Sequence, residues 1–104
     1  MLKAIEQYRR AIQLKSEAAE AHFELGNELA ADNRKSEAVS EYNEAIRLRP
    51  TYAEARLNLG VLLAMEGQFD NALRQFAETL RLDPGNKLAL EYSDRVQGWK
   101  SRKP

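Results

Sequence analysis

The sequence contains no cysteine, and this absence excludes several kinds of chemistry. Disulfide bonds, thiolate metal ligands and a cysteine nucleophile are all ruled out. Histidine is nearly absent as well, because His22 is the only one among 104 residues. A metal site needs several converging ligands, and a catalytic triad needs a histidine beside a nucleophile and an orienting acid. We therefore expect no catalytic residue, no metal and no cofactor, and we expect His22 to serve packing.

Net charge and long apolar runs are lacking too. Sixteen basic and sixteen acidic residues cancel, whereas nucleic-acid binders usually carry a basic excess. No apolar stretch approaches the ~20 residues that a membrane span needs, and no signal-peptide pattern follows Met1. We expect no nucleic-acid partner and no membrane insertion. The compartment itself is not indicated, and the cytoplasm is the default expectation.

The charges that are present are segregated along the chain. Residues 1–16 hold four basic residues against one acidic residue, a net charge of +3. Residues 17–46 hold two basic residues against eight acidic ones, a net charge of −6. Such segregation is typical of solvated helix surfaces, and the sharper alternative is an acidic patch that selects a partner or its orientation.

The strongest positive signal is an internal repeat of 34 residues. When residues 19–52 are laid over residues 53–86, Gly26 falls on Gly60, Tyr42 on Phe76 and Pro50 on Pro84. A fixed period of this length indicates helical units that cannot bury their apolar faces alone and must stack.

The repeated glycines predict a close helix contact. Gly26 and Gly60 fall within expected helices, where glycine costs about 0.5–1 kcal/mol relative to alanine. A cost that recurs at the same position implies a recurring gain, which we assign to the close approach of a partner helix. Ala38 and Ala72 are the small residues expected to face this contact, and the aromatic residues at 42 and 76 are expected to fill the adjoining space.

The spacing of apolar residues predicts about six helices. Asp32-Asn33, Pro50, Gly67 and the turn at 83–86 separate them, and Ser36 and Thr51 are expected to cap two of them. The expected helices span about 2–14, 18–31, 36–49, 52–66, 69–82 and 87–99. This predicts one domain, 1–99, that consists of a half repeat (1–16), two full repeats (19–52 and 53–86) and a capping helix (87–99), followed by a basic tail (100–104).

These motifs resemble the tetratricopeptide repeat family. The matching patterns are His22-x2-Leu25-Gly26-x2-Leu29, Ala38-x3-Tyr42 and Pro50, and then Arg56-x2-Leu59-Gly60-x2-Leu63, Ala72-x3-Phe76 and Pro84. The family's usual tryptophan is replaced by His22 and Arg56, and its usual tyrosine by Leu29 and Leu63. The resemblance implies an all-α, right-handed superhelix of stacked antiparallel helix pairs, with a concave groove that binds an extended peptide or a helix of another protein.

The resemblance also implies which residues line the groove. Carried over position by position, they are Phe23, Glu24, Asn27, Leu57, Asn58, Val61, Met65, Tyr92 and Arg95. Some members of the family hold acidic tails of heat-shock chaperones in a carboxylate clamp, and Asn27 and Asn58 match its two asparagines. Phe23 replaces the first clamp lysine, and Glu91 stands where a cation would help. We therefore do not expect a clamp.

Three functions remain open at this stage. The leading one is a non-catalytic scaffold for protein–protein interaction through the groove. The alternatives are a self-assembly module that uses the ends of the stack, and a non-catalytic segment of a larger protein such as a transferase. The chain opens on the second helix of a repeat, which leaves Ile5, Tyr8 and Ile12 without the helix that would cover them. This predicts weak self-association, most simply as a two-fold dimer, with a head-to-tail stack on the Tyr92–Trp99 end as the second choice.

Overall fold

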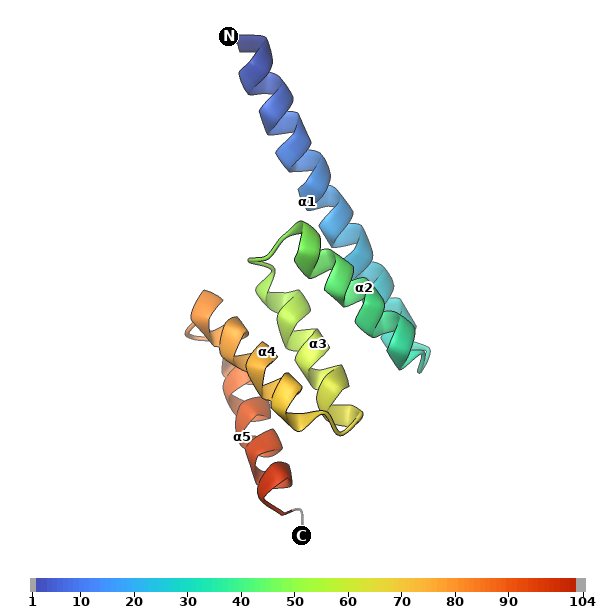
Figure 1. Ribbon diagram of the computed structural model, residues 1–104, viewed down its shortest axis with the longest axis vertical. Helices are drawn as coiled ribbons and strands as arrows, with labels where there is room; N and C mark the ends of the chain where they lie inside the picture. The colour runs from blue at the N-terminus through green and yellow to red at the C-terminus, as the bar shows by residue number, and fades with distance from the viewer. Residues whose placement is uncertain (1, 103–104) are drawn as a thin grey trace.

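The helices of the chain stack in antiparallel layers (Figure 1). A computed structural model describes residues 2–102, and within that range it has five α-helices and no strand. They are α1 (Leu2–Ala31), α2 (Lys35–Leu48), α3 (Ala53–Met65), α4 (Phe69–Leu82) and α5 (Lys87–Ser101). Each helix packs mainly against its neighbours in the chain, so that α2 lies between α1 and α3, and α4 lies between α3 and α5. The expected fold class, an all-α solenoid of stacked helix pairs, is confirmed.

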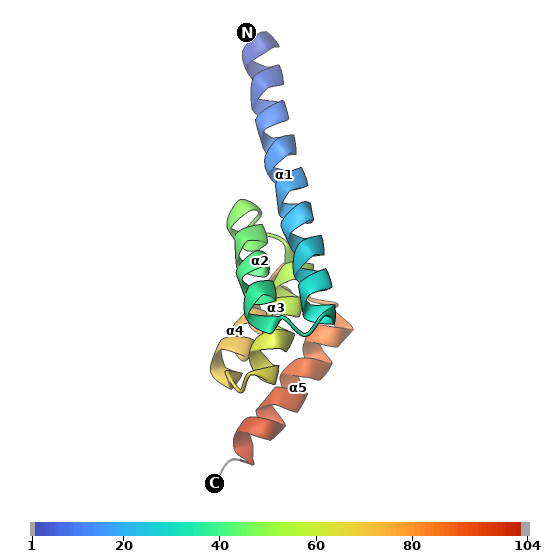
Figure 2. The same cartoon turned by 90° about the vertical axis from the view of Figure 1, so that its right-hand side faces the viewer.

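The first helix departs most from expectation. The sequence predicted separate helices at 2–14 and 18–31, but both segments belong to one continuous helix, so the described residues hold five helices rather than about six. Proline follows the ends of α2 and α4, whereas Ser16 stands at the equivalent position in α1 and does not force the backbone out of the helix. The Ser16 hydroxyl accepts a hydrogen bond from Arg49 Nη1 at 3.2 Å. The N-terminal half of α1 therefore projects beyond the other helices (Figure 2).

Three of the predicted helix ends are confirmed. Asn33 follows α1 with a φ of 61°, and Gly67 follows α3 with a φ of 81°, so both adopt the left-handed conformation that closes a helix. The turn at residues 83–86 ends with Asn86, whose side chain accepts a hydrogen bond from the backbone N–H of Ala89 at 2.9 Å. Asn86 is thus the N-cap of α5, a role that the sequence analysis did not assign.

Two predicted caps are wrong. Ser36 lies inside α2, because that helix begins at Lys35 with Arg34 as its N-cap. Thr51 lies one residue too early, because Tyr52 is the N-cap of α3. Neither helix has a side-chain capping hydrogen bond. A hydroxyl must stand at the N-cap itself to accept from the first free N–H groups of the helix, so a shift of one residue removes the interaction.

The C-terminal helix is longer than predicted. The sequence analysis placed a basic tail at 100–104, but α5 continues through Ser101. Lys100 Nζ lies 2.6 Å from Asp70 Oδ1, and this ion pair links the end of α5 to the start of α4. Residues 103 and 104 of the predicted tail lie outside the described range.

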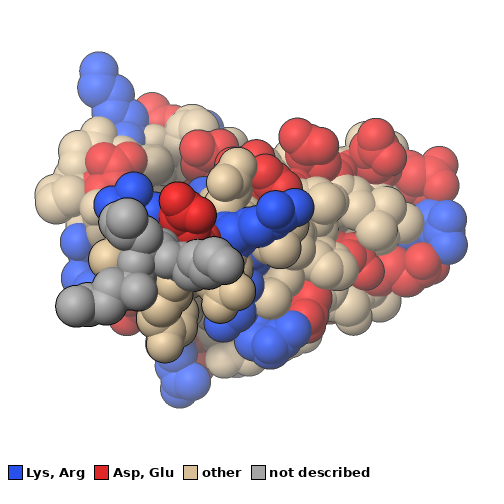
Figure 3. Space-filling view, turned by 90° about the horizontal axis from the view of Figure 1, so that it is seen from above, with Lys and Arg blue, Asp and Glu red and all other residues tan. Residues whose placement is uncertain are grey.

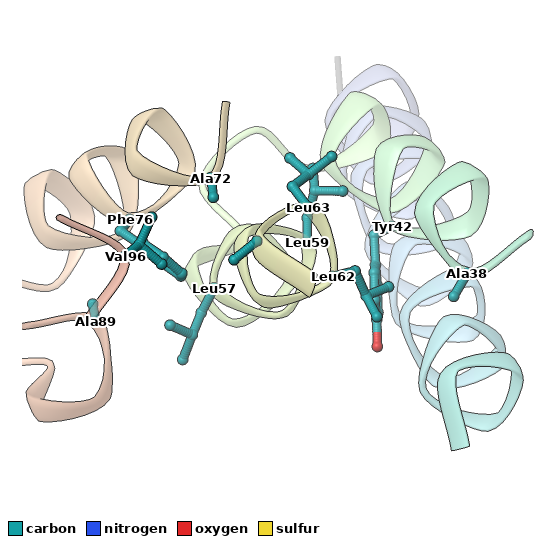
Figure 4. Close-up of a cluster of buried hydrophobic side chains, with 11 residues drawn as sticks. Ala38, Tyr42, Leu57, Leu59, Leu62, Leu63, Ala72, Phe76, Ala89 and Val96 are labelled. Carbon is teal, nitrogen blue, oxygen red and sulfur yellow. The ribbon is translucent and has the colours of Figure 1, made fainter. Parts of the chain in front are cut away.

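The two repeated glycines lie under aromatic rings. These rings, Tyr42 and Phe76, belong to the cluster of buried side chains in Figure 4. A Cβ atom added to Gly26 would stand 2.7 Å from Cε1 of Tyr42, and one added to Gly60 would stand 2.6 Å from Cε1 of Phe76. The predicted close contact is confirmed at both positions. An aromatic ring contacts each glycine. Ala38 and Ala72 are fully buried one turn before the rings, on α2 and α4.

Candidate functional site

A hollow of about 430 Å³ lies on the side of the stack formed by α1, α3 and α5. It contains six of the nine residues predicted for the groove: Asn27, Leu57, Asn58, Val61, Met65 and Tyr92. Leu57 contributes little surface, because it is only 7% exposed and belongs mainly to the core. Met65, by contrast, is exposed and offers its thioether to the hollow.

A smaller hollow of about 80 Å³ continues this surface toward the end of α5. Its lining shares Val61, Met65 and Tyr92 with the first hollow and adds Arg95, a seventh predicted residue, and Trp99. The guanidinium of Arg95 lies 5.9 Å from the centre of the Tyr92 ring, within the range of a cation–π contact. The two hollows thus form one surface with an apolar floor and a cation at the α5 end.

Two asparagines provide the polar centre of the larger hollow. Asn58 Nδ2 donates to Asn27 Oδ1 at 2.9 Å, and the hydroxyl of Tyr42 donates to the same oxygen at 2.5 Å. Both donors use Oδ1 of Asn27, so these two hydrogen bonds leave the NH₂ group of Asn27 and the Oδ1 atom of Asn58 unused. Burial raises the pKa of Tyr42 above its ordinary value, and the polar side chain of Asn58 opposes part of that shift. Tyr42 therefore remains a neutral donor that fixes the Asn27 amide.

The remaining two predicted groove residues do not line either hollow. Phe23 is half-buried and packs on the rings of Tyr42 and Tyr52, at centroid distances of 5.9 and 4.9 Å. Glu24 is exposed on α1. Contact of these two residues with a partner stays a prediction.

The hollow also includes residues that the sequence analysis missed. Leu88 contributes from the start of α5, and Lys35 contributes from the start of α2. Leu88 lies one turn before Tyr92 on the same helix, so the helical spacing from that predicted residue could have indicated it. No comparable signal exists for Lys35, whose position depends on the turn between α1 and α2.

The single histidine makes a polar contact between two helices, which the sequence did not predict. His22 Nδ1 lies 2.6 Å from Glu41 Oε1 on α2. At the equivalent positions of the next repeat, Arg56 Nη1 donates to Gln75 Oε1 at 3.4 Å. The position filled by tryptophan in many repeats of the family thus links the two helices of each pair through a hydrogen bond. Within residues 2–102, no group of three histidine, cysteine or acidic side chains is placed to hold a metal ion.

The residues predicted for self-association lie on the projecting half of α1. Ile5, Tyr8 and Ile12 are all exposed there. Acidic side chains gather on the side of the molecule where Figure 1 places α2, as the view from above shows (Figure 3). This matches the negative charge of residues 17–46. None of the described helices is long and apolar enough to cross a lipid bilayer.

Comparisons with known proteins identify related sequences and folds. A family model described as "Tetratricopeptide repeat" matches residues 24–87, more than half of the chain, and a second, described as "TPR repeat", matches residues 3–32. No curated protein matches the sequence.

Two solved structures resemble the fold. One, described as the crystal structure of MamA protein, has a TM-score of 0.79 and 27% sequence identity, and the match covers 95% of this chain. This chain spans only 54% of that protein. The other is described as the second TPR of Spaghetti (RPAP3) bound to the HSP90 peptide SRMEEVD, with a TM-score of 0.84, 16% identity, and coverage of 89% of this chain and 85% of that one. At 16% identity the second comparison shows the fold alone.

Proposed function

Because this chain belongs to the tetratricopeptide repeat family, we propose that it is a non-catalytic scaffold that holds a peptide segment or a helix of another protein. The proposed binding surface is the groove formed by the two hollows described above. It is lined by Asn27, Asn58, Val61, Met65, Leu88, Tyr92 and Arg95.

The observation that carries this proposal is the asparagine pair at the centre of an apolar surface. A peptide backbone presents both a donor and an acceptor, and the NH₂ group of Asn27 and the amide oxygen of Asn58 supply the complementary pair. Tyr42 holds Asn27 in place, so the pair is ordered before a ligand arrives. Preorganised polar groups in an apolar pocket are the usual basis of orientation and specificity in binding sites.

The lining favours an apolar anchor over an acidic tail. Val61, Met65 and Tyr92 surround the deeper part of the groove, and a leucine or an aromatic side chain of the ligand would bury its surface there. The place of the first clamp lysine is filled by Phe23, which packs on Tyr52. Glu24 is exposed nearby and would repel a carboxylate. The proposed ligand is therefore an amphipathic helix or an extended peptide with apolar anchors.

The test is a selection from a library of displayed peptides of random sequence, followed by binding measurements with the purified chain. Peptides that bind specifically should share apolar anchor residues. Asn58→Ala and Val61→Ala should each weaken a selected peptide by about tenfold or more, as central contacts do. The peptide SRMEEVD is a useful second probe and should bind more weakly than the selected peptides.

Leu90→Ala is the control for Val61→Ala, because it also shortens an apolar side chain. Leu90 lies on α5, is 50% exposed and lines neither hollow. The control substitution should leave the affinity unchanged. If the selected peptides bound equally well to the Asn58 and Val61 variants, the groove would not be the binding surface. If SRMEEVD bound more tightly than every selected peptide, the proposal of an apolar anchor would be wrong.

A further inference from the structure

Among residues 2–102, nothing covers one face of α1 along most of its length. The residues of this face are Gln7, Ala11, Leu14, Ala18, Ala21 and Leu25, which we call the α1 seam. They are separated by four, three, four, three and four positions, the spacing of the apolar line in a two-stranded coiled coil. Ala18 is half-buried and the other five are exposed, including both leucines. Such spacing on a helix that the rest of the molecule does not cover points to a partner helix.

The seam is complementary to itself when it is reversed, because its spacing reads the same in both directions. An antiparallel copy centred on residue 16 places Gln7 opposite Leu25, Ala11 opposite Ala21, and Leu14 opposite Ala18. Large residues then face small or flexible ones, which permits close packing without collision. We propose that two copies of this chain form a two-fold dimer in which their α1 helices pair antiparallel along the α1 seam.

The charges of α1 select this orientation. Residues 2–16 hold four basic side chains and one acidic, a net charge of +3, and residues 17–31 hold four acidic and none that is always basic, a net charge of −4. The antiparallel arrangement places each positive half beside the negative half of the other copy, whereas a parallel one would place like charges together. Arg10 and Glu24 flank the seam on the same side and would form reciprocal ion pairs between the copies.

A second, independent argument comes from the internal repeat. Leu59 is the equivalent of Leu25 and is 2% exposed, while Leu25 is 43% exposed. Leu59 is covered because it lies on the side of α3 that faces α2 (Figure 4). The equivalent of α2 is the segment 2–14, which in this chain continues straight and cannot fold back onto its own Leu25. In the antiparallel dimer the same segment of the other copy takes that place.

The exposed isoleucines that were predicted for self-association lie on another side of α1 than the α1 seam. Ile5 and Ile12 precede Ala19 by two and one heptads, so the three share one side of the helix. Ala19 is fully buried on the side of α1 that packs against α2. Ile5 and Ile12 therefore point away from the α1 seam, and the antiparallel pairing leaves them exposed. Asn27 lies on the opposite side of α1 from the seam, so both grooves of the dimer stay open.

The first test is sedimentation equilibrium of the 104-residue chain from low-micromolar concentration to its solubility limit. We expect a monomer–dimer equilibrium that weakens with added salt. Leu14→Glu and Leu25→Glu should each raise the dissociation constant at least tenfold, and Leu90→Glu, at a similarly exposed leucine of α5, should not. Circular dichroism confirms that the variants fold. A chain that stays monomeric throughout, or a dimer that tolerates Leu25→Glu, would overturn the proposal.

The second test measures orientation, and the absence of natural cysteine makes it simple. Ala11→Cys mixed with Ala21→Cys should form a disulfide-linked dimer under oxidation, while neither variant should link to itself, because equal residues lie about 15 Å apart in this register. Efficient linking of Ala11→Cys to itself would show a parallel pair and overturn the proposal. Arg10→Glu should weaken the dimer several-fold, and adding Glu24→Arg to the same chain should restore it. Failure of the second change to restore the affinity would also contradict the antiparallel register.

Discussion

Gly60→Ala adds one methyl group at a buried glycine that lies directly under the ring of Phe76. The new Cβ atom would lie 2.6 Å from Cε1 and 2.9 Å from Cδ1 of Phe76. Carbon atoms in good contact lie about 3.5–4.0 Å apart, so the ring would have to move by roughly 1 Å. Phe76 is fully buried. Overpacking of this kind costs about 1–3 kcal/mol, and the better helix propensity of alanine returns only about 0.5–1 kcal/mol. We expect a net loss of about 1–2 kcal/mol.

Thermal unfolding followed by circular dichroism measures this loss. For a domain of this size, 1 kcal/mol corresponds to a shift of about 4–8 °C, so Gly60→Ala should lower Tm by roughly 5–15 °C. Gly98→Ala is the matched control, because Gly98 also lies within a helix but has no atom within 4 Å of an added Cβ. That substitution should raise Tm by a few degrees through helix propensity alone.

A double variant separates overpacking from other causes. Phe76→Leu removes the ring that meets the new methyl group, so Gly60→Ala should cost much less in its presence than in the natural sequence. The reasoning would be refuted if Gly60→Ala melted at or above the natural chain. It would also be refuted if the costs of the two substitutions simply added.

Three further predictions follow from the polar contacts. Tyr42→Phe should lower the free energy of unfolding in urea by about 0.5–1.5 kcal/mol, because its hydrogen bond to Asn27 is lost. Phe76→Tyr should lower it by more, because Val61 stands at the position equivalent to Asn27 and offers no acceptor to the new hydroxyl. Equal losses for the two substitutions would contradict this account. Burial raises the pKa of Tyr42 and Tyr52 above the ordinary 10.0, so their contribution to stability is present below that pH and is lost as the pH rises through the folded-state pKa. Phenol absorbance should show two late ionisations, and Tyr42→Phe and Tyr52→Phe should each remove one. Lys100 lowers the pKa of Asp70 from the ordinary 3.8, so the stability from this pair is present above that pH and is lost as the pH falls through the folded-state pKa. In an NMR titration, Lys100→Ala should raise the pKa of Asp70. An unchanged pKa would mean that the ion pair does not form in solution.

The sequence predicted the core well because the repeat period records packing directly. A glycine that recurs at a fixed sequence separation from an aromatic residue indicates that the two residues are in contact, as Gly60 and Phe76 are. The family resemblance, carried over position by position, placed Asn58, Val61 and Met65 on one surface, and all three line the larger hollow. Positions inside regular helices are therefore predictable once the period is known. Lys35, Ser36 and Thr51 lie at the starts of helices or just before them. A shift of one residue there changes the direction of a side chain, and the repeat period does not determine where a helix starts.

The straight course of α1 was the largest miss, and it changes the meaning of the predicted self-association. The sequence predicted residues 2–14 to be a separate helix, the second of a repeat, with Ile5 and Ile12 exposed because no first helix covers them. In the structure the same residues continue into 18–31 as one helix. The important pattern then extends across both segments, because Leu14 and Leu25 share a face only when no turn separates them. A single polar residue at position 16, in place of proline, accounts for that continuity.

The exposed faces of α1 and α5 differ in whether another helix can pack on them. Shifted by 34 positions, Leu59, Gly60 and Leu63 of α3 correspond to Ser93, Asp94 and Gln97 of α5. An aromatic ring of the kind that covers Gly60 would meet the Asp94 carboxylate instead, and burying that charge without a partner would be costly. The outer face of α5 is therefore unsuited to another helix of the α4 type, which disfavours head-to-tail stacking on this end. The α1 seam carries leucine and alanine at the corresponding contact, so association between copies is favoured at α1 and opposed at α5. This asymmetry predicts dimers that stop at two copies, because each pairing uses both halves of α1 and leaves no second seam for growth.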